Sequence, residues 1–262
     1  MVSCGEATGY GEITTDGLLE LLESVADRLG FKDADDLMTG ASFLDIGSGC
    51  GGAVLFTAHH WHDVRMSVGV ELVRERHDEA EVLLAKATSG NECNLEKRVK
   101  YINADFFDVP WSDLAPPACG HEEDCDAQRA RIIIWANTLL FGDDPHTRIL
   151  QRIEADARDD DDVFILSTRR LEMLPFRRDV LAWIDGPFEM SWLSGCSVQC
   201  VRLPPVGTVI DRSALDVSLQ RRPPKGRICS HKEFLGQLLV GSVDDSLAAH
   251  RGRSAKQRER SV

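Results

Sequence analysis

The chain has 262 residues, 43% of them hydrophobic, which is enough to bury the core of one large α/β domain with an extension or of two small domains. Its apolar stretches fall short of the roughly 20 residues that a membrane helix needs, so we expect one main soluble domain and no membrane partner. The formal net charge of −13 excludes a protein that coats nucleic acid with its whole surface, because phosphate binding depends on lysine and arginine.

The charge is distributed unevenly along the chain. Residues 202–262 hold twelve lysines and arginines against six aspartates and glutamates, a balance of +6, which leaves −19 for residues 1–201. An acidic body with a basic tail suits a target that presents both signs of charge, such as histone protein wrapped in DNA. A solvated, frayed C-terminus is the alternative, because such charged runs are commonly disordered.

Cysteine usage indicates a reducing compartment. The eight cysteines include no C-x-x-C pair and no signal peptide precedes them, so we expect no disulfide framework and a cytosolic or nuclear protein. Cys119, His121 and Cys125 in "CGHEEDC" have the chemistry of metal ligands, but no fourth ligand stands at a usual spacing and the segment has the composition of an acidic loop. We therefore expect no metal site.

The predicted elements begin with a helix over residues 16–30, whose leucines and valine recur at spacings of three and four. Thr14 or Thr15 is its expected N-cap, and Gly30 stands where a C-terminal cap belongs. Strands and helices then alternate along the chain. We expect strands over residues 42–46, 65–72, 130–137 and 161–168, with a further strand within residues 98–107, and helices over residues 52–60, 73–89 and 145–158.

This alternation predicts an α/β fold with a parallel sheet, right-handed crossovers and a ligand at the carboxyl ends of the strands. After residue 186 the pattern changes, and residues 188–203 resemble two strands around a Ser-Gly turn, which predicts an antiparallel pair that closes the sheet. We divide the chain into an N-terminal loop and helix (1–40), a core (41–203) and a C-terminal extension with a basic, partly disordered end (204–262).

A glycine-rich turn, "FLDIGSGCGGAVL" over residues 43–55, joins the strand over 42–46 to the next helix. Gly47, Gly49 and Gly52 satisfy the pattern G-x-G-x-x-G, which is typical of dinucleotide sites. Glu71 ends the following strand, where it can accept hydrogen bonds from the ribose of a dinucleotide or of an adenosyl cofactor. The glycines alone therefore leave both cofactor classes open.

Asp45, just before the turn, favours the adenosyl cofactor. A carboxylate is unfavourable beside a pyrophosphate, which backbone N–H groups should face, but favourable beside the ammonium group of a methionine moiety. The turn thus resembles the first motif of class I S-adenosylmethionine methyltransferases. Later strands end in "NADFFD", with Asp105 placed for the adenine amino group and Phe106 for the adenine face, and in "WAN", with Asn137 near the expected sulfonium methyl.

Each of these residues also has a purely structural explanation. Asp105 could cap a turn and Phe106 could belong to the core. Glu71 could be a solvated residue at the start of a helix, and Asn137 could bond its own loop. Together, however, they follow successive strands of one sheet, at the edge where ligands bind in such folds, which favours a shared site.

Further segments resemble the disruptor-of-telomeric-silencing (Dot-one) family, non-SET methyltransferases that modify a lysine in the globular core of histone H3. The resemblance spans about residues 10–203. It is carried by "YGEITTDGLLELL", "FLDIGSGCGGAVL", "GVEL", "ADFFD", "WANTLLFG", "STRRLEMLPFR" and "SWLSGCSVQCVRL". The Y-G-E loop and the Ser-Trp segment that begins at Ser191 are more specific than the glycine turn.

The resemblance implies a class I, Rossmann-like fold with a seven-stranded, mostly parallel sheet and an antiparallel last strand. It implies S-adenosylmethionine as cofactor, histone H3 lysine N-methylation in nucleosomes as activity and chromatin regulation in the nucleus as setting. The cofactor-binding positions that it implies are Tyr10, Gly11, Glu12, Ile13, Asp45, Gly47, Gly49, Gly51, Gly52, Glu71, Asp105, Phe106 and Asn137. It makes Asn137 and Tyr10 catalytic and places Leu139, Phe141, Trp192 and Cys200 along a lysine channel.

The chain departs from the family at several of these positions. Residues 137–141, "NTLLF", replace the family's N-N-F-A-F, and residues 199–201, "QCV", stand where the family has a tyrosine pair. Gly52 stands where the family tends to have a larger polar residue. Only nine residues precede Tyr10, so the chain resembles the compact, trypanosomatid-like members.

Other functions fit parts of the sequence. A nicotinamide-dependent oxidoreductase would use the glycine loop but leaves the Y-G-E loop and the Ser-Trp segment unexplained. A chromatin adaptor could bind S-adenosylmethionine without transferring its methyl group, and a class I methyltransferase could act on another protein. Protein arginine methyltransferases require two glutamates after the fourth strand, where "NTLLFGDD" offers aspartates only.

Overall fold

The computed structural model describes residues 12–89, 94–116, 130–137, 143–169, 178–191 and 194–209. Its helices are α1 (Thr15–Leu29), α2 (Ala34–Met38), α3 (Gly52–His60), α4 (Arg74–Thr88), α5 (Leu95–Arg98), α6 (Trp111–Leu114) and α7 (Asp143–Asp156), with a 3-10 turn η1 (Phe106–Asp108). Its strands are β1 (Ser42–Ile46), β2 (Met66–Glu71), β3 (Val99–Asn103), β4 (Arg131–Ala136), β5 (Asp162–Ser167), β6 (Leu181–Glu189) and β7 (Ser194–Leu203). Among these helices, not one has the length and apolar character needed to cross a membrane.

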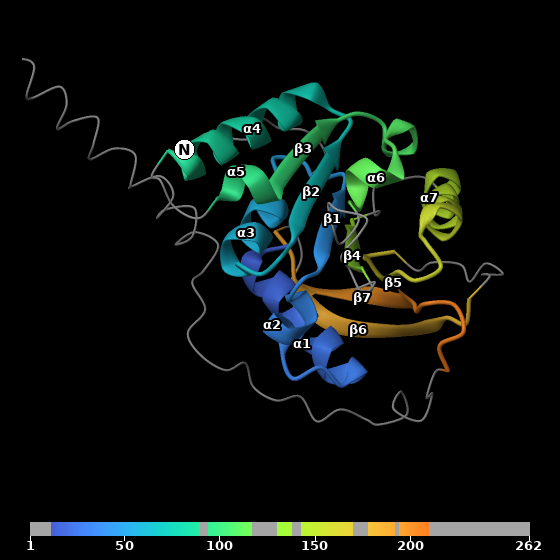
Figure 1. The fold of residues 1–262 in the computed structure, drawn as a ribbon. Coiled ribbons are helices and arrows are strands. Elements are labelled where there is room, and N and C mark those ends of the chain that lie inside the picture. The colour runs from blue at the N-terminus through green and yellow to red at the C-terminus, as the bar shows by residue number, and fades with distance from the viewer. Residues whose placement is uncertain are drawn as a thin grey trace, which may run out of the picture.

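The strands form one seven-stranded sheet in the order β3-β2-β1-β4-β5-β7-β6 (Figure 1). Strands β1 to β5 are parallel, and β7 runs antiparallel to both β5 and β6. This arrangement confirms the predicted class I, Rossmann-like fold with its antiparallel last strand. The chain proceeds outward in opposite directions from β1 and β4, so the ligand crevice of such a sheet lies at the carboxyl ends of these two strands.

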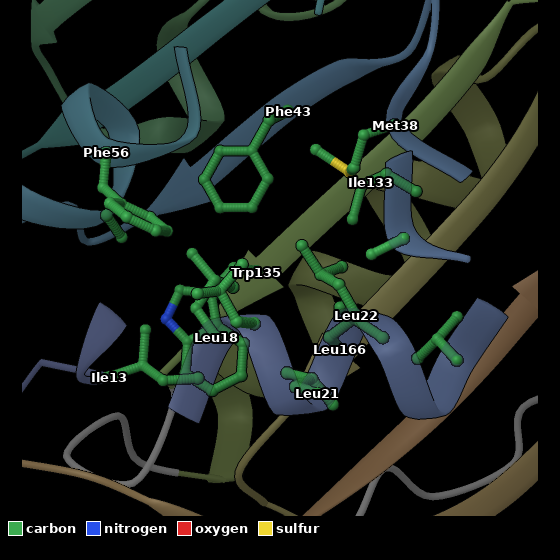
Figure 2. Packing of buried hydrophobic residues seen from close by; sticks show 14 of the residues in the cluster. Ile13, Leu18, Leu21, Leu22, Met38, Phe43, Phe56, Ile133, Trp135 and Leu166 are labelled. Carbon is green, nitrogen blue, oxygen red and sulfur yellow. The ribbon is translucent and has the colours of Figure 1, made fainter. Parts of the chain in front are cut away.

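Hydrophobic layers cover both faces of the sheet, because the central strands carry apolar residues on both sides. All five residues of β1 are buried, and successive residues face opposite layers. Phe43 and Trp135 pack with the helix α1, for example against Leu18 (Figure 2). On the other face, Leu44 packs in a cluster with Ile153 of α7. Asp45 alternates with Leu44 and therefore points to the α1 side.

Helix α1 follows the prediction closely. The side chain of Thr14 accepts a hydrogen bond from the backbone N–H of Gly17 at 3.0 Å, which makes Thr14 rather than Thr15 the N-cap. Gly30 ends the helix with a φ of 78°, and its N–H donates to the carbonyls of Ala26 and Asp27. Both caps satisfy backbone groups that a helix end leaves unpaired.

Strand β3 ends at Asn103, within the segment predicted to contain it, and the following residues turn into η1. Two predicted boundaries are wrong. Helix α7 begins at Asp143, two residues before the proline that was expected to start it. Strand β6 begins at Leu181 rather than at residue 188, because its pairing with β7 extends back to that point. The loop with Cys119, His121 and Cys125, and the chain after residue 209, lie outside the described residues.

Candidate functional site

The glycine-rich turn lies at the carboxyl end of β1. Gly47, Gly49 and Gly51 have positive φ angles of 79°, 56° and 80°, a region that side chains with a Cβ disfavour. The N–H groups of Gly47 and Ser48 both donate to the carbonyl of Val70, at 2.9 and 3.1 Å. The turn is therefore held against the end of β2. Gly51 caps the start of α3 without a side-chain bond, and Gly52 is the first residue of that helix.

Glu71, at the end of β2, is buried and its side chain also holds the turn. Its Oε2 accepts from the N–H of Gly49 at 2.8 Å, and its Oε1 accepts from the N–H of Val73, the N-cap residue of α4, also at 2.8 Å. Each carboxylate oxygen can accept more than one hydrogen bond, so these contacts are compatible with a ribose ligand. In this structure Glu71 fixes both the glycine turn and the start of the next helix.

Tyr101 on β3 also holds the glycine turn through a hydrogen bond. This residue was not identified from the sequence. Its phenol donates to the carbonyl of Gly51 at 2.8 Å, and a Cβ added at Gly51 would lie 2.5 Å from the phenol ring. Burial, and then the nearby carboxylates of Asp45 and Glu12, raise the pKa of the Tyr101 phenol, which keeps it a donor. One signal was available: Tyr101 is one of only two tyrosines and stands on the strand next to β2.

Residues near the N-terminus lie against the end of β6, although 179 positions separate them in the chain. Ile13 forms an antiparallel bridge with Met190. The N–H of Glu12 donates to the hydroxyl of Ser191, and the N–H of Ser191 donates to the carbonyl of Glu12, both at 2.9 Å. Two segments predicted separately, the Y-G-E loop and the Ser-Trp segment, therefore meet in one place.

The next residues continue this attachment. Thr14 donates through its N–H and its hydroxyl to the carbonyl of Glu189, at 3.4 and 3.1 Å. A Cβ added at Gly17 would lie only 2.0 Å from that same carbonyl oxygen, so only glycine allows α1 to approach β6 this closely. We call residues 12–14 the strap, since they bind residues 189–191.

A pocket lies between the strap and the carboxyl ends of β1 and β4. The pocket is small, and the space inside it, part of which is open to solvent, is about 230 Å³. Its walls are formed by Glu12, Ile13, Asp45, Gly47, Ser48, Ala53, Trp135 and Asn137. Five of these residues are among the expected cofactor-binding positions.

Asp45 makes the pocket electrostatically unusual. Its side chain is 4% exposed, and burial raises the pKa of its carboxyl well above the usual value of 3.8, with further increases from the negative charges of Glu12 and Glu71. A buried carboxylate next to other carboxylates is costly unless a cation neutralises it. The pocket is therefore suited to a positively charged group.

Asn137 follows β4 and lines the pocket. Its side-chain Oδ1 accepts a hydrogen bond from the hydroxyl of Thr168 at 3.0 Å. Thr168 follows β5, which pairs with β4 in parallel, so the contact joins two neighbouring strand ends rather than the loop of Asn137 itself.

The structure agrees with the structural explanations offered for the residues after β3. Asp105 is exposed and caps η1, with its Oδ1 accepting from the N–H of Phe107 at 2.9 Å. Phe106 is 6% exposed and packs in the core on the α7 side, with the guanidinium carbon of Arg152 4.6 Å from its ring centre. A contact of either residue with adenine stays a prediction.

The expected lysine channel is only partly described. Tyr10, Gly11, Leu139, Phe141 and Trp192 lie outside the described residues. Cys200 is buried on β7 within the core cluster that contains α1 and does not line this pocket, so its place along a lysine channel stays a prediction. The side chains of the described ranges contain no group of three or more metal-ligand residues placed to hold an ion.

Neither a protein-family model nor a curated protein sequence matches this chain. Among solved structures, it is similar to an RNA methyltransferase from Salinibacter ruber in complex with S-adenosyl-L-homocysteine, with 13% identity over 74% of this chain and 94% of the other and a TM-score of 0.43. It is also similar to a human methyltransferase 10 domain containing protein (14%, 72% and 82%, TM-score 0.46). A third is the plantazolicin methyltransferase BpumL in complex with SAH (12%, 73% and 86%, TM-score 0.41).

Proposed function

We propose that the chain is an S-adenosylmethionine-dependent methyltransferase that modifies a lysine in the globular core of histone H3 in nucleosomes. The observation that carries the proposal is the pocket at the carboxyl ends of β1 and β4, where buried Asp45 faces the acidic strap residue Glu12 and Asn137. The fold supports a methyltransferase. The charge distribution and the family resemblance support the histone substrate.

The residues of the pocket fit the methionine end of the cofactor. Its ammonium group would lie beside Asp45 and Glu12, which offsets the electrostatic cost of the buried Asp45 carboxylate. The glycine turn exposes backbone without side chains, which allows a ligand to approach closely. Because the pocket is small, the adenosine part would extend out along the end of β2, where Glu71 can accept from ribose hydroxyls and exposed Asp105 can accept from the adenine amino group.

The chemistry asked of these residues is mainly positioning. When bound, S-adenosylmethionine would supply a methyl group on a positively charged sulfur, and this sulfur would be the leaving group as the amine nitrogen bonds to the methyl carbon in line. Holding the reacting groups in line is worth roughly 7 to 11 kcal/mol of the barrier. Among the residues that the structure describes, we assign Asn137 to orient the amine, because it follows β4 and lines the same pocket as Asp45. The lysine must first lose a proton, which a desolvated channel favours because burial lowers the pKa of an amine.

The histone substrate is supported by the resemblance and by charge. The Y-G-E loop and the Ser-Trp segment, its most specific motifs, meet at the hydrogen bonds between Glu12 and Ser191. The balance of −19 over residues 1–201 suits a basic histone, and the +6 of residues 202–262 suits the DNA around it. Nucleosomes as partner and the nucleus as location belong to the same proposal.

The test is methyl transfer from radiolabelled S-adenosylmethionine to nucleosomes and to free histone H3, with mass spectrometry of the histone. Wild-type protein should modify nucleosomes. Asn137→Ala should lower the rate by about 100-fold or more, the cost of a misplaced reacting group, while S-adenosylhomocysteine binding persists. Full activity of this variant would remove Asn137 from the mechanism.

Transfer and cofactor-binding measurements together separate the alternatives. Cofactor binding without transfer to any protein would favour the adaptor. Transfer to other proteins but not to histone H3 would keep the methyltransferase and reject the substrate. No affinity for S-adenosylhomocysteine, together with affinity for a nicotinamide dinucleotide, would favour the oxidoreductase.

A further inference from the structure

One hydrogen bond joins Asn137, which lines the pocket, to Thr168, which does not line it. The hydroxyl of Thr168 donates to Oδ1 of Asn137 at 3.0 Å. The two residues follow the last paired positions of β4 and β5, Ala136 and Ser167, so the parallel register brings them together at the carboxyl edge. No feature of either segment alone would identify this contact.

The bond sets the direction of the Asn137 carboxamide. Strand β4 lies between β1 and β5, so the bond to Thr168 holds the amide oxygen of Asn137 at the β5 side of the pocket. An amide has an acceptor end and a donor end, and these ends differ in what they can offer a reacting group. Without the hydroxyl, the amide oxygen would lose this contact on the β5 side.

The direction matters for an amine that must attack a methyl group. An acceptor that takes an N–H of the amine leaves the nitrogen lone pair for the methyl carbon. A donor pointed at the amine would instead bind that lone pair and suppress the attack. An amide oxygen has two lone pairs, so acceptance from Thr168 does not exhaust its capacity.

We infer that Thr168 is a positioning residue, which holds the Asn137 amide so that its oxygen accepts an N–H of the incoming amine. The inference rests on the proposed function, because it assigns a role at the same methyl-transfer position. It extends that proposal to a residue on β5 that does not line the pocket.

The test compares two ligands that differ at the methyl-transfer position. S-adenosylhomocysteine has a bare sulfur there, and sinefungin carries an amine on a carbon in place of the methylated sulfur. Calorimetry should show that Thr168→Val weakens sinefungin about tenfold relative to S-adenosylhomocysteine, the value of one hydrogen bond to a charged group. Thr168→Ser, which keeps the hydroxyl, should retain the wild-type ratio of the affinities for sinefungin and S-adenosylhomocysteine. Thr88→Val, which removes a hydroxyl from α4, should leave the ratio unchanged.

Transfer assays provide a second readout. Thr168→Val should lower kcat on nucleosomes about tenfold with little change in the KM for S-adenosylmethionine, and Thr168→Ser should restore kcat. If Thr168→Val does not fold, Thr168→Ala serves as the variant without the hydroxyl.

The outcomes separate the inference from the proposal beneath it. A wild-type protein that binds neither ligand would overturn the proposed function and the inference with it. Binding of both ligands with an unchanged ratio in Thr168→Val, or failure of Thr168→Ser to match wild type, would overturn the role of Thr168 and leave the methyltransferase standing.

Discussion

Asp45 is buried in a strand at the centre of the sheet, where a charge is most costly. In the folded chain its pKa lies well above the 3.8 of an ordinary aspartate, chiefly because of burial. Between these two values the folded state holds a proton that the unfolded state has released, so the free energy of unfolding decreases as pH rises through that range. Above the folded pKa the full cost of the buried carboxylate is present.

We therefore expect Asp45→Asn to make the protein more stable at pH 8, because the amide carries no charge that must be buried. Near pH 4 the gain should disappear. The same variant should lose affinity for S-adenosylhomocysteine, because the amide cannot neutralise an ammonium group. Urea unfolding at both pH values measures the stability, and calorimetry measures the binding.

Asp27→Asn, at an exposed position of α1, is the matched control and should show neither effect. A loss of stability at pH 8 in Asp45→Asn would mean that the carboxylate is stabilised within the fold rather than reserved for a ligand.

At the scale of elements, the approach of α1 to β6 depends on one glycine. Alanine within a helix is normally more stable than glycine by up to about 1 kcal/mol. At Gly17, however, the added Cβ would lie 2.0 Å from the carbonyl oxygen of Glu189, which is backbone and cannot simply rotate away. We expect Gly17→Ala to destabilise the protein by about 1 to 3 kcal/mol, the usual cost of overpacking, and to weaken cofactor binding by displacing the strap.

Glu20→Ala, at an exposed position of the same helix, controls for the change in helix propensity and should alter stability by less than about 0.5 kcal/mol. Thermal and urea unfolding check both variants. A Gly17→Ala protein as stable as Glu20→Ala would show that α1 can move from β6 at no cost.

Local patterns predicted most of the elements. The alternation of apolar strands and amphipathic helices identified β1 to β5, and the capping residues identified both ends of α1. The helices α2, α5 and α6 have only four or five residues, too short for a helical period to repeat, so periodicity could not predict them. The early start of β6 depends on pairing with β7, which is a tertiary effect.

The site was predictable where each residue follows its own strand, and not where residues meet across the fold. Asp45, Glu71 and Asn137 stand next to strands, so their place at the sheet edge follows from the strand pattern. Tyr101, Ser191 and Thr168 act through contacts with residues that are 31 to 179 positions away in the chain. Such partners become visible only when the register of the sheet is known.

At the scale of the whole molecule, charge separates the chain into an acidic body and a basic end. Residues 221–262 hold ten lysines and arginines against four aspartates and glutamates. If this segment contacts nucleosomal DNA, its removal should weaken nucleosome binding and flatten the dependence of affinity on salt, because fewer counterions are released. Titrations between 50 and 200 mM salt, roughly the range over which phosphate contacts lose most affinity, measure the slope.

The same truncation should leave the affinity for S-adenosylhomocysteine intact, which distinguishes lost DNA contacts from a damaged site. A full-length chain in which these basic residues are replaced by glutamine is the control for length. An unchanged salt slope in both proteins would count against the tail as a DNA-binding segment.

The strap also has a consequence for protein synthesis. Glu12 leaves the ribosome early, but Ser191, which fixes it with two hydrogen bonds, is made 179 residues later. A nascent chain can therefore form the glycine turn and the central strands well before the strap has anything to bind. The pocket is closed only once nearly the whole core has been translated, so a tightly held cofactor marks a chain whose core is complete.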